Sequence, residues 1–110
     1  MRRLVATEQV AFEIAVASKN VANAWRALER IHIITQIFAG LHITSHLRML
    51  RYAWELRDWK EIVGQFFRLA LAPIGNLTGR IPFGNTGRSN VSAFQPMEIP
   101  TDLGANIAKL

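Results

Sequence analysis

A change of pattern at Pro73 constrains the fold of this chain more than any other feature. Before Pro73, apolar residues recur every three or four positions, as they do along one face of an α-helix. After it, apolar residues are spaced irregularly and are interrupted by three prolines and several glycines. We therefore expect a single domain over residues 1–110, with a helical part over residues 1–73 and an irregular, wrapping tail over residues 74–110.

Four helices are expected in the helical part. Their predicted ranges are 8–18, 21–38, 42 or 45 to 57, and 58–73. Gly40 suits the left-handed position just after the second helix. Asp58 and Glu61 form a capping-box pattern that opens the fourth helix, and Pro73 is expected to end it. A short final helix is expected to begin near Thr101.

The helical part contains a weak internal repeat with an offset of 38 residues. At this offset Ala24 and Leu28 correspond to Ile62 and Phe66. Each unit is a helix, a short polar break and a second helix, an arrangement similar to the hairpins of tetratricopeptide repeats. The expected fold is all-α: two antiparallel helical hairpins covered by the tail, because two hairpins alone bury little surface.

Composition excludes several classes of protein. The 13 basic and 8 acidic residues give a net charge of +5, but the basic residues are dispersed, so nucleic acid is not an expected partner. The chain has no cysteine, which excludes disulfides and thiolate metal sites and fits a reducing compartment. Polar residues or proline interrupt the apolar segments 31–43 and 66–74, so we expect no membrane partner and a cytoplasmic location.

Three histidines and one glutamate have the spacing of metal ligands. His42 and His46 are four residues apart, which puts both rings on one face of a helix. Glu29 and His32 show the Glu-x-x-His spacing of metal-binding helical bundles. If the two helices pack antiparallel about Gly40, these side chains converge on a divalent metal such as zinc or nickel. Alternatively, the histidines are hydrogen-bonded core residues, and a helix beginning near residue 45 leaves His42 in a loop.

The tail contains a polar cluster over residues 84–90, Gly-Asn-Thr-Gly-Arg-Ser-Asn. Gly84 and Gly87 permit backbone angles at which successive N–H groups point at one anion. The predicted anion-binding residues are Arg80, Asn85, Thr86 and Arg88. The cluster lacks the Gly-Lys-Ser/Thr ending of a phosphate loop, so the alternative is a structural loop whose side chains bond its own backbone.

No sequence pattern predicts a catalytic residue, because nucleophile elbows, cysteine nucleophiles and carboxylate pairs in a readable context are all lacking. The first functional hypothesis is a non-enzymatic interaction module that binds a protein partner or itself. Its apolar surface would include Ile33, Ile37, Phe67 and Leu71. The second is a metal-binding accessory protein that uses the histidines. The third is an anion-binding protein or enzyme in which the polar cluster faces His46.

Three motifs make the chain similar to a small bacterial family of unknown function. They are His42-x-x-x-His46-x-Arg48-Met49-Leu50, Asp58-Trp59-x-Glu61-x-x-Gly64-Gln65-x-x-Arg68, and GNTGxxNVSxFxPMxIP from Gly84 to Pro100. The resemblance covers nearly the whole chain and is clearest from Glu29 onward. It implies a bacterial single-domain protein and no particular reaction, and it directs attention to the histidine pair and the polar cluster.

Overall fold

The computed structural model describes residues 1–79, 82–91 and 95–109 of the chain. Within these residues it contains five helices and no strand. The helices are α1 (Arg2–Ala17), α2 (Val21–Thr35), α3 (Ala39–Leu56), α4 (Trp59–Thr78) and α5 (Thr101–Ile107). The expectation of an all-α fold with a short final helix is confirmed.

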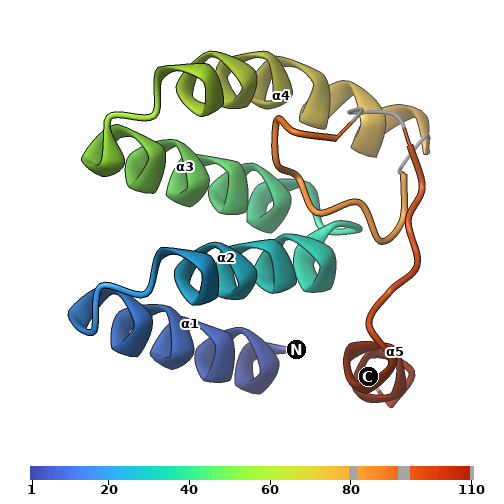
Figure 1. Ribbon diagram of the computed structural model, residues 1–110. Helices are drawn as coiled ribbons and strands as arrows, with labels where there is room; N and C mark the ends of the chain where they lie inside the picture. Colours follow the sequence, from blue (N-terminus) through green and yellow to red (C-terminus); the bar gives the residue numbers. More distant parts are fainter. Residues whose placement is uncertain (80–81, 92–94, 110) are drawn as a thin grey trace.

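The first four helices form one stack in chain order, each antiparallel to the next (Figure 1). α1 packs against α2 and α3 against α4, which confirms the two predicted hairpins, and α2 packs against α3 to join them. The chain then crosses one end of the stack and finishes in α5, which contacts α2 (Figure 1). The two ends of the stack are therefore different: one has only hairpin turns, and the other is covered by the tail.

The two hairpin turns repeat each other at the predicted offset of 38 residues. Lys19 and Arg57 are the two positive-φ residues other than glycine in the described chain, with φ of 58° and 54°. The next residues, Asn20 and Asp58, cap the following helices by accepting a hydrogen bond from a backbone N–H three positions on. Glu61 does not return the bond as a capping box would, because its side chain is buried elsewhere.

Apolar packing holds the hairpins together. The main core cluster joins all four stacked helices and consists of Ala15, Ala24, Trp25, Leu28, Met49, Tyr52, Ala53 and Ile62. A second cluster, formed by Ile33, Ile34 and Leu103, attaches α5 to the last turns of α2. Ile33 is therefore buried and does not contribute to the apolar surface predicted for it.

The ends of the first two helices differ from the prediction. α1 begins at Arg2 rather than at residue 8, so Thr7 lies within the helix and its hydroxyl bonds back to the Arg3 carbonyl. α2 ends at Thr35, where the Phe38 N–H bonds the Thr35 carbonyl and closes a tight turn. Gly40 therefore lies in the first turn of α3 and is not a helix-terminating residue.

α4 continues through Pro73 to Thr78, so the predicted end at Pro73 is wrong. Proline removes one backbone hydrogen bond from a helix, and Pro73 lies on the exposed side of α4. The helix ends instead at Gly79, whose φ of 73° is the left-handed conformation that glycine adopts most readily. The extra turn includes Asn76, whose side chain is half-buried.

The buried face of α4 is more polar than predicted. Glu61, Gln65 and Arg68 are buried on it, whereas Phe66, the counterpart of the buried Leu28, is exposed. Phe67 is also exposed, as expected for the predicted apolar surface. Among the described residues, α3 is the helix that packs closely on α4, so the residues on the far side of α4 are exposed. None of the helices in the described ranges has both the length and the apolar character needed to cross a membrane.

Candidate metal centre

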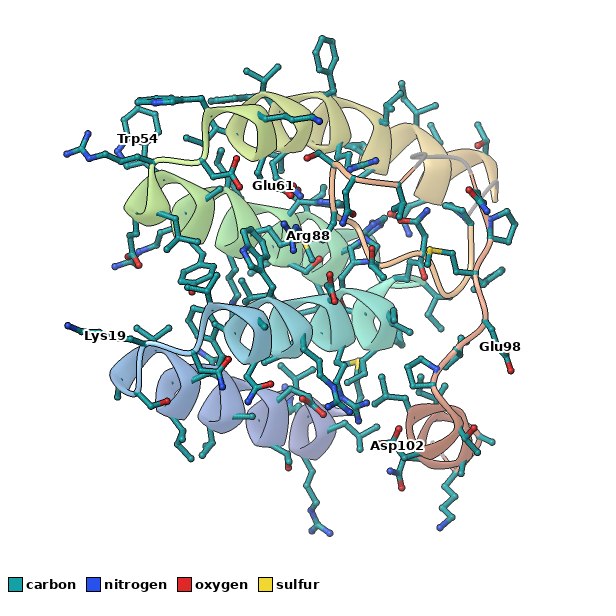
Figure 2. The ribbon with its side chains drawn as sticks, in the orientation of Figure 1. Lys19, Trp54, Glu61, Arg88, Glu98 and Asp102 are labelled. Atoms are coloured by element: carbon teal, nitrogen blue, oxygen red, sulfur yellow. The ribbon has the colours of Figure 1, made fainter. Side chains whose placement is uncertain are left out.

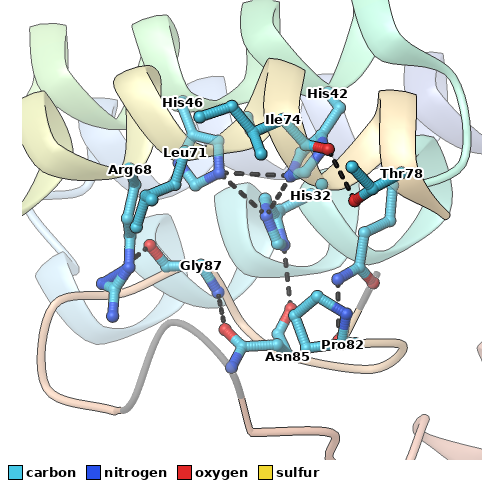
Figure 3. Close-up of a pocket in the computed structure, with 13 residues that line it drawn as sticks. His32, His42, His46, Arg68, Leu71, Ile74, Thr78, Pro82, Asn85 and Gly87 are labelled. Carbon is cyan, nitrogen blue, oxygen red and sulfur yellow. Dashed lines mark hydrogen bonds between the residues drawn. The ribbon is translucent and has the colours of Figure 1, made fainter. Parts of the chain in front are cut away.

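Three histidine side chains meet where α2 approaches α3. His32 comes from α2, His42 and His46 come from α3, and all three are less than a tenth exposed. The Nε2 atom of His32 lies 3.0 Å from Nε2 of His42 and 3.1 Å from Nε2 of His46. The Nε2 atoms of His42 and His46 are 3.2 Å apart. The three rings therefore direct the same nitrogen toward one point (Figure 3).

Helix geometry accounts for this meeting. α3 begins at Ala39, so His42 lies in its first turn and shares a face with His46 one turn later. The alternative start near residue 45 is wrong. Because α2 and α3 are antiparallel neighbours, the last turn of α2 places His32 opposite these two rings.

The other ring nitrogen of each histidine has an oxygen partner at 2.8 Å. Nδ1 of His32 faces the backbone carbonyl of Asn85. Nδ1 of His42 faces Oδ1 of Asn76, and Nδ1 of His46 faces Oε1 of Gln65. The tail and two separate turns of α4 therefore orient the three rings, as outer partners do around metal-binding histidines.

These partners accept hydrogen bonds, which assigns the tautomers. A backbone carbonyl only accepts, so His32 donates from Nδ1. The amide nitrogen of Asn76 donates to the Gln36 carbonyl at 3.0 Å, which leaves its oxygen facing His42. The amide nitrogen of Gln65 donates to the Glu61 carboxylate and the Gly87 carbonyl, each at 2.8 Å, which leaves its oxygen facing His46.

Three lone pairs consequently face one another. A neutral imidazole that carries its proton on Nδ1 has a bare lone pair on Nε2. With all three Nδ1 atoms protonated, no hydrogen lies between the converging Nε2 atoms, although they are 3.0–3.2 Å apart. A cation bound by all three nitrogens would remove the repulsion and use every lone pair.

The surroundings keep the rings neutral. Burial is the main cause that lowers the pKa of all three histidines, to about 4 for His46 and well below the ordinary value for His32. Repulsion from the other two rings and from Arg68 lowers the pKa of His32 further. Neutral imidazole is the form that binds metals, so no proton has to be removed near neutral pH.

The tail packs directly on the site. We call residues 82–91 the tail loop; it contains the polar cluster. A Cβ atom on Gly87 would lie 2.8 Å from His32 ring atoms, and Gly87 has a φ of 83°. Gln36 attaches the start of the loop, donating to the Pro82 carbonyl at 2.7 Å and accepting from the Gly84 N–H at 3.1 Å. The loop therefore closes one side of the histidine site with backbone rather than with side chains.

A pocket of about 230 Å³ opens beside the three imidazoles (Figure 3). One wall is the inner face of α4, with Arg68, Leu71, Ala72, Ile74, Gly75 and Thr78. The tail loop supplies the opposite wall through Pro82, Asn85 and Gly87. A metal held by the histidines would therefore have a side accessible to a small molecule.

The model of a protein family described as "Protein of unknown function (DUF3703)" matches residues 1–107. The chain belongs to this family. The predicted resemblance to a small family of unknown function is thereby confirmed. Comparison with curated proteins and with solved structures gives no match.

Glu29, the fourth predicted metal ligand, faces away from this group. The cluster of possible metal ligands in the described chain contains the three histidines and not Glu29. Its carboxylate lies 3.6 Å from Arg88, and burial is the main cause that raises its pKa. The structure thus brings together three of the four predicted side chains.

The four predicted anion-binding residues are distributed differently. Arg80 lies outside the described residues. The Arg88 guanidinium pairs with Glu61 and Glu29 and stacks 3.7 Å above the Trp25 ring, so it is directed at the chain's own groups (Figure 2). The Asn85 side-chain oxygen accepts from the Gly87 N–H at 2.9 Å, and the Thr86 hydroxyl oxygen accepts from the Arg88 N–H. Anion binding by these residues remains a prediction.

Glu61 connects Arg88 to the histidines. Its carboxylate accepts from Arg88, from the Ser89 N–H at 2.9 Å and from Gln65, which in turn orients His46. Burial raises the pKa of Glu61, but the hydrogen bonds from Arg88, Gln65 and Ser89 outweigh it and leave the pKa below the ordinary value. Glu61 is therefore ionised and already neutralised by Arg88.

Four residues of the site were not predicted from the sequence: Glu61, Gln65, Arg68 and Asn76. Three of them carried a signal that was available. Glu61, Gln65 and Arg68 follow helical spacing along the face that α4 turns toward α3. Polar residues on a core-facing side of a helix indicate a buried polar site. Asn76 carried no comparable signal, because Pro73 was expected to end the helix before it.

Proposed function

We propose that this protein binds one divalent transition-metal ion through the Nε2 atoms of His32, His42 and His46. The observation that carries the proposal is the orientation of the rings: three acceptors hold the three Nδ1 protons, so three lone pairs converge. A set of core histidines that only needed hydrogen-bond partners would not require all three Nε2 atoms to face one another without a proton.

The size of the triangle suits a metal. Sides of 3.0–3.2 Å put the centre of the triangle about 1.8 Å from each nitrogen. At a zinc–nitrogen distance of about 2.0–2.1 Å, an ion lies about 1 Å out of the plane, with all three ligands on one side. The opposite side remains open, as in zinc sites that bind water or a substrate at the fourth position.

Ligand chemistry narrows the choice of ion. Imidazole suits zinc, nickel, copper and iron, whereas magnesium and calcium prefer oxygen ligands. Zinc and nickel are therefore the first ions to test. All three ligands are neutral, so the ion keeps its full charge of about +2 within the pocket.

The site supports metal-dependent binding better than catalysis. A zinc ion with an open position polarises its ligands and lowers the pKa of bound water to about 7. Among the described residues that line the pocket, none is a carboxylate or an additional histidine that would serve as a general base. We therefore propose a non-enzymatic metal-binding protein.

Zinc titration tests the proposal. Chelator-treated protein is titrated by calorimetry, and its melting temperature is measured with and without zinc. We expect one zinc per chain, and a stabilisation of about 2.7 kcal/mol when free zinc is 100 times Kd. His46→Ala is expected to abolish both effects, while Thr44→Ala, at an exposed position of the same helix, keeps them. Unchanged zinc binding in His46→Ala contradicts the proposal.

A second candidate function, self-association, is favoured by the outer face of α4. Phe67 is 69% exposed and Leu77 is 88% exposed, and Val63 and Phe66 are exposed on the same helix. Between Val63 and Thr78 the exposed residues of α4 carry no charge. A second copy of the chain brings an equally apolar and uncharged face, which a two-fold axis matches to the first.

The mass of the protein in solution tests self-association. We expect a dimer that Phe67→Glu converts to a monomer, because a carboxylate cannot be buried without a partner. Val10→Glu, at an exposed apolar position on α1, should leave the dimer intact. A wild-type monomer at high concentration contradicts this second candidate without affecting the metal proposal.

A further inference from the structure

The pocket beside the histidines contains a buried cation. Arg68 is only 8% exposed and lines the pocket. Its guanidinium donates to the Gly87 carbonyl at 3.4 Å and to the Val91 carbonyl. Both acceptors are uncharged, so these bonds orient the guanidinium without neutralising it.

No carboxylate in the described ranges forms an ion pair with Arg68. Glu61 acts on Arg68 from a distance, but its oxygens are engaged by Arg88, Gln65 and Ser89. Burying a charge without a counter-ion is unfavourable, so such a group indicates a ligand of opposite charge.

The internal repeat shows what a neutralised arginine looks like at this position. Arg30 lies 38 residues before Arg68 and occupies the equivalent place in the first hairpin. It pairs with Glu8 at 2.7 Å and with Asp102 of α5. The residue equivalent to Glu8 in the second hairpin is His46. The second hairpin thus keeps the arginine and replaces its acid with a histidine of the proposed metal site.

Apart from Gln36, Thr78 and Asn85, the residues that line the rest of the pocket have no polar side chain. Leu71, Ala72 and Ile74 of α4 face Pro82 of the tail loop across it. A hydrated inorganic anion would leave these walls unused. A ligand that matches the whole pocket has one anionic end and a short apolar body.

We infer that the pocket binds a small organic carboxylate, with the carboxylate between the three-histidine metal and Arg68 and the apolar body against Leu71, Ile74 and Pro82. This inference rests on the proposed metal function for one of its two cationic contacts. Arg68 supplies the other contact independently of the metal.

Cobalt(II) substitution provides a spectroscopic test on the full chain. The visible absorption of bound cobalt reports a ligand that enters its open position. We expect butanoate and hexanoate to change the spectrum saturably and to bind at least tenfold more tightly than formate. Butanamide, which has the same body without the charge, and inorganic phosphate are expected to bind at least tenfold more weakly than butanoate.

Two pairs of variants assign the contacts. Arg68→Met should weaken butanoate at least tenfold while cobalt still binds one per chain, and Arg51→Met, which removes an exposed arginine, should change neither. Leu71→Ala should reduce the preference for hexanoate over formate. Leu77→Ala, on the exposed side of the same helix, should not.

The outcomes separate this inference from the metal proposal. If cobalt binds and no carboxylate changes its spectrum, or if phosphate and formate bind as well as butanoate, the inference is wrong and the metal site stands. If no cobalt binds, the metal site is wrong. The inference is then decided by the melting temperature of the metal-free chain, which butanoate must raise in the wild type but not in Arg68→Met.

Discussion

The two hairpins share one helical arrangement but carry different side chains at equivalent buried positions. In the first hairpin, Glu8 of α1 neutralises Arg30 of α2. In the second, the equivalent residues are His46 and Arg68, and the arginine has no acid partner in the described chain. The first hairpin therefore balances its own charges, whereas the second leaves a cation beside three imidazoles.

The difference is confined to one end of the stack. At the end with the hairpin turns, Lys19 and Arg57 adopt the same left-handed conformation, and Asn20 and Asp58 cap the next helices in the same way. At the other end, the tail loop covers the second hairpin and contributes the carbonyl that orients His32. The two hairpins are thus alike at the end that carries their turns and differ at the end that carries the histidine site.

Converting the second hairpin to the pattern of the first is expected to have the largest effect. His46→Glu places an acid beside Arg68, as Glu8 lies beside Arg30, and replaces one metal-binding imidazole with a carboxylate that the arginine engages. We expect the zinc-dependent rise in melting temperature, roughly 10 °C or more at saturation, to disappear while the helical content is retained. The measurement is a thermal melt with and without zinc.

The reverse exchange is the matched control. Glu8→His should create no metal site, because position 4, equivalent to His42, is Leu4 and position 27, equivalent to Gln65, is Ala27. The His46→Glu result would contradict this account if zinc stabilised that variant as much as the wild type. In that case the exchange of glutamate for histidine between the two hairpins would not explain metal binding.

The stability of the metal-free chain should depend on pH through the second hairpin. Burial lowers the pKa of the three histidines, to about 4 for His46 against an ordinary value of 6.5. A lowered histidine pKa contributes stability that is present above about pH 6.5 and is lost as the pH falls toward the folded-state pKa. For His46 alone, the full loss is roughly 3 kcal/mol.

Urea unfolding between pH 7 and pH 4 measures this loss. Arg68 opposes protonation of His32 and His46, whereas Glu61 favours it at His46. Because carboxylates elsewhere also titrate in this range, the comparison is with His46→Ala, whose decline should be shallower. Equal slopes in the two proteins would show that His46 is not held neutral by burial.

The contact between the tail loop and His32 predicts a cost for any side chain at Gly87. Gly87→Ala combines a left-handed φ with a Cβ placed against the ring, and we expect a loss of about 2–3 kcal/mol and weaker zinc binding. Gly79→Ala, which has the same φ region but open space, should cost about 1 kcal/mol.

Gly40→Ala completes this series. Gly40 is in the first turn of α3 with nothing near its missing Cβ, so alanine should stabilise the chain by up to about 1 kcal/mol. Chemical denaturation measures all three variants. If Gly87→Ala is no worse than Gly79→Ala, the loop does not pack on His32 as described.

The smallest effect is expected at an exposed ion pair of the second hairpin. Arg51 and Glu55 lie 3.5 Å apart at i, i+4, and both are largely exposed. Arg51→Met should change the free energy of unfolding by less than about 0.5 kcal/mol. A loss of more than about 1 kcal/mol in the free energy of unfolding would mean that this exposed pair contributes as much as a buried one.

Most of the fold follows from local sequence patterns. Apolar spacing and polar breaks predicted the hairpins, and the 38-residue offset is reproduced by the caps and left-handed residues of both turns. Helix ends were less predictable. Pro73 lies on the exposed side of α4, and Gly40 lies inside α3, and neither position can be known before the helices are packed.

The candidate site was predictable only in part. The i, i+4 spacing identified His42 and His46, and antiparallel packing made His32 a plausible third member. The rotation of α2 about its axis places His32 rather than Glu29 in the group. The spacing of these two residues along the sequence does not determine that rotation. The partners Asn76 and Gln65 depend on the path of α4, and the Asn85 carbonyl depends on the irregular tail, for which no periodic pattern exists.

Nitrogen NMR of the histidine rings tests the central claim most directly. In the metal-free protein at neutral pH, correlations between ring protons and both ring nitrogens distinguish a protonated nitrogen from one with a lone pair. We predict that His32, His42 and His46 each carry the proton on Nδ1, and that zinc shifts all three Nε2 resonances together. A proton on Nε2 of any of the three rings, or a zinc-induced shift in only one of them, would contradict the account.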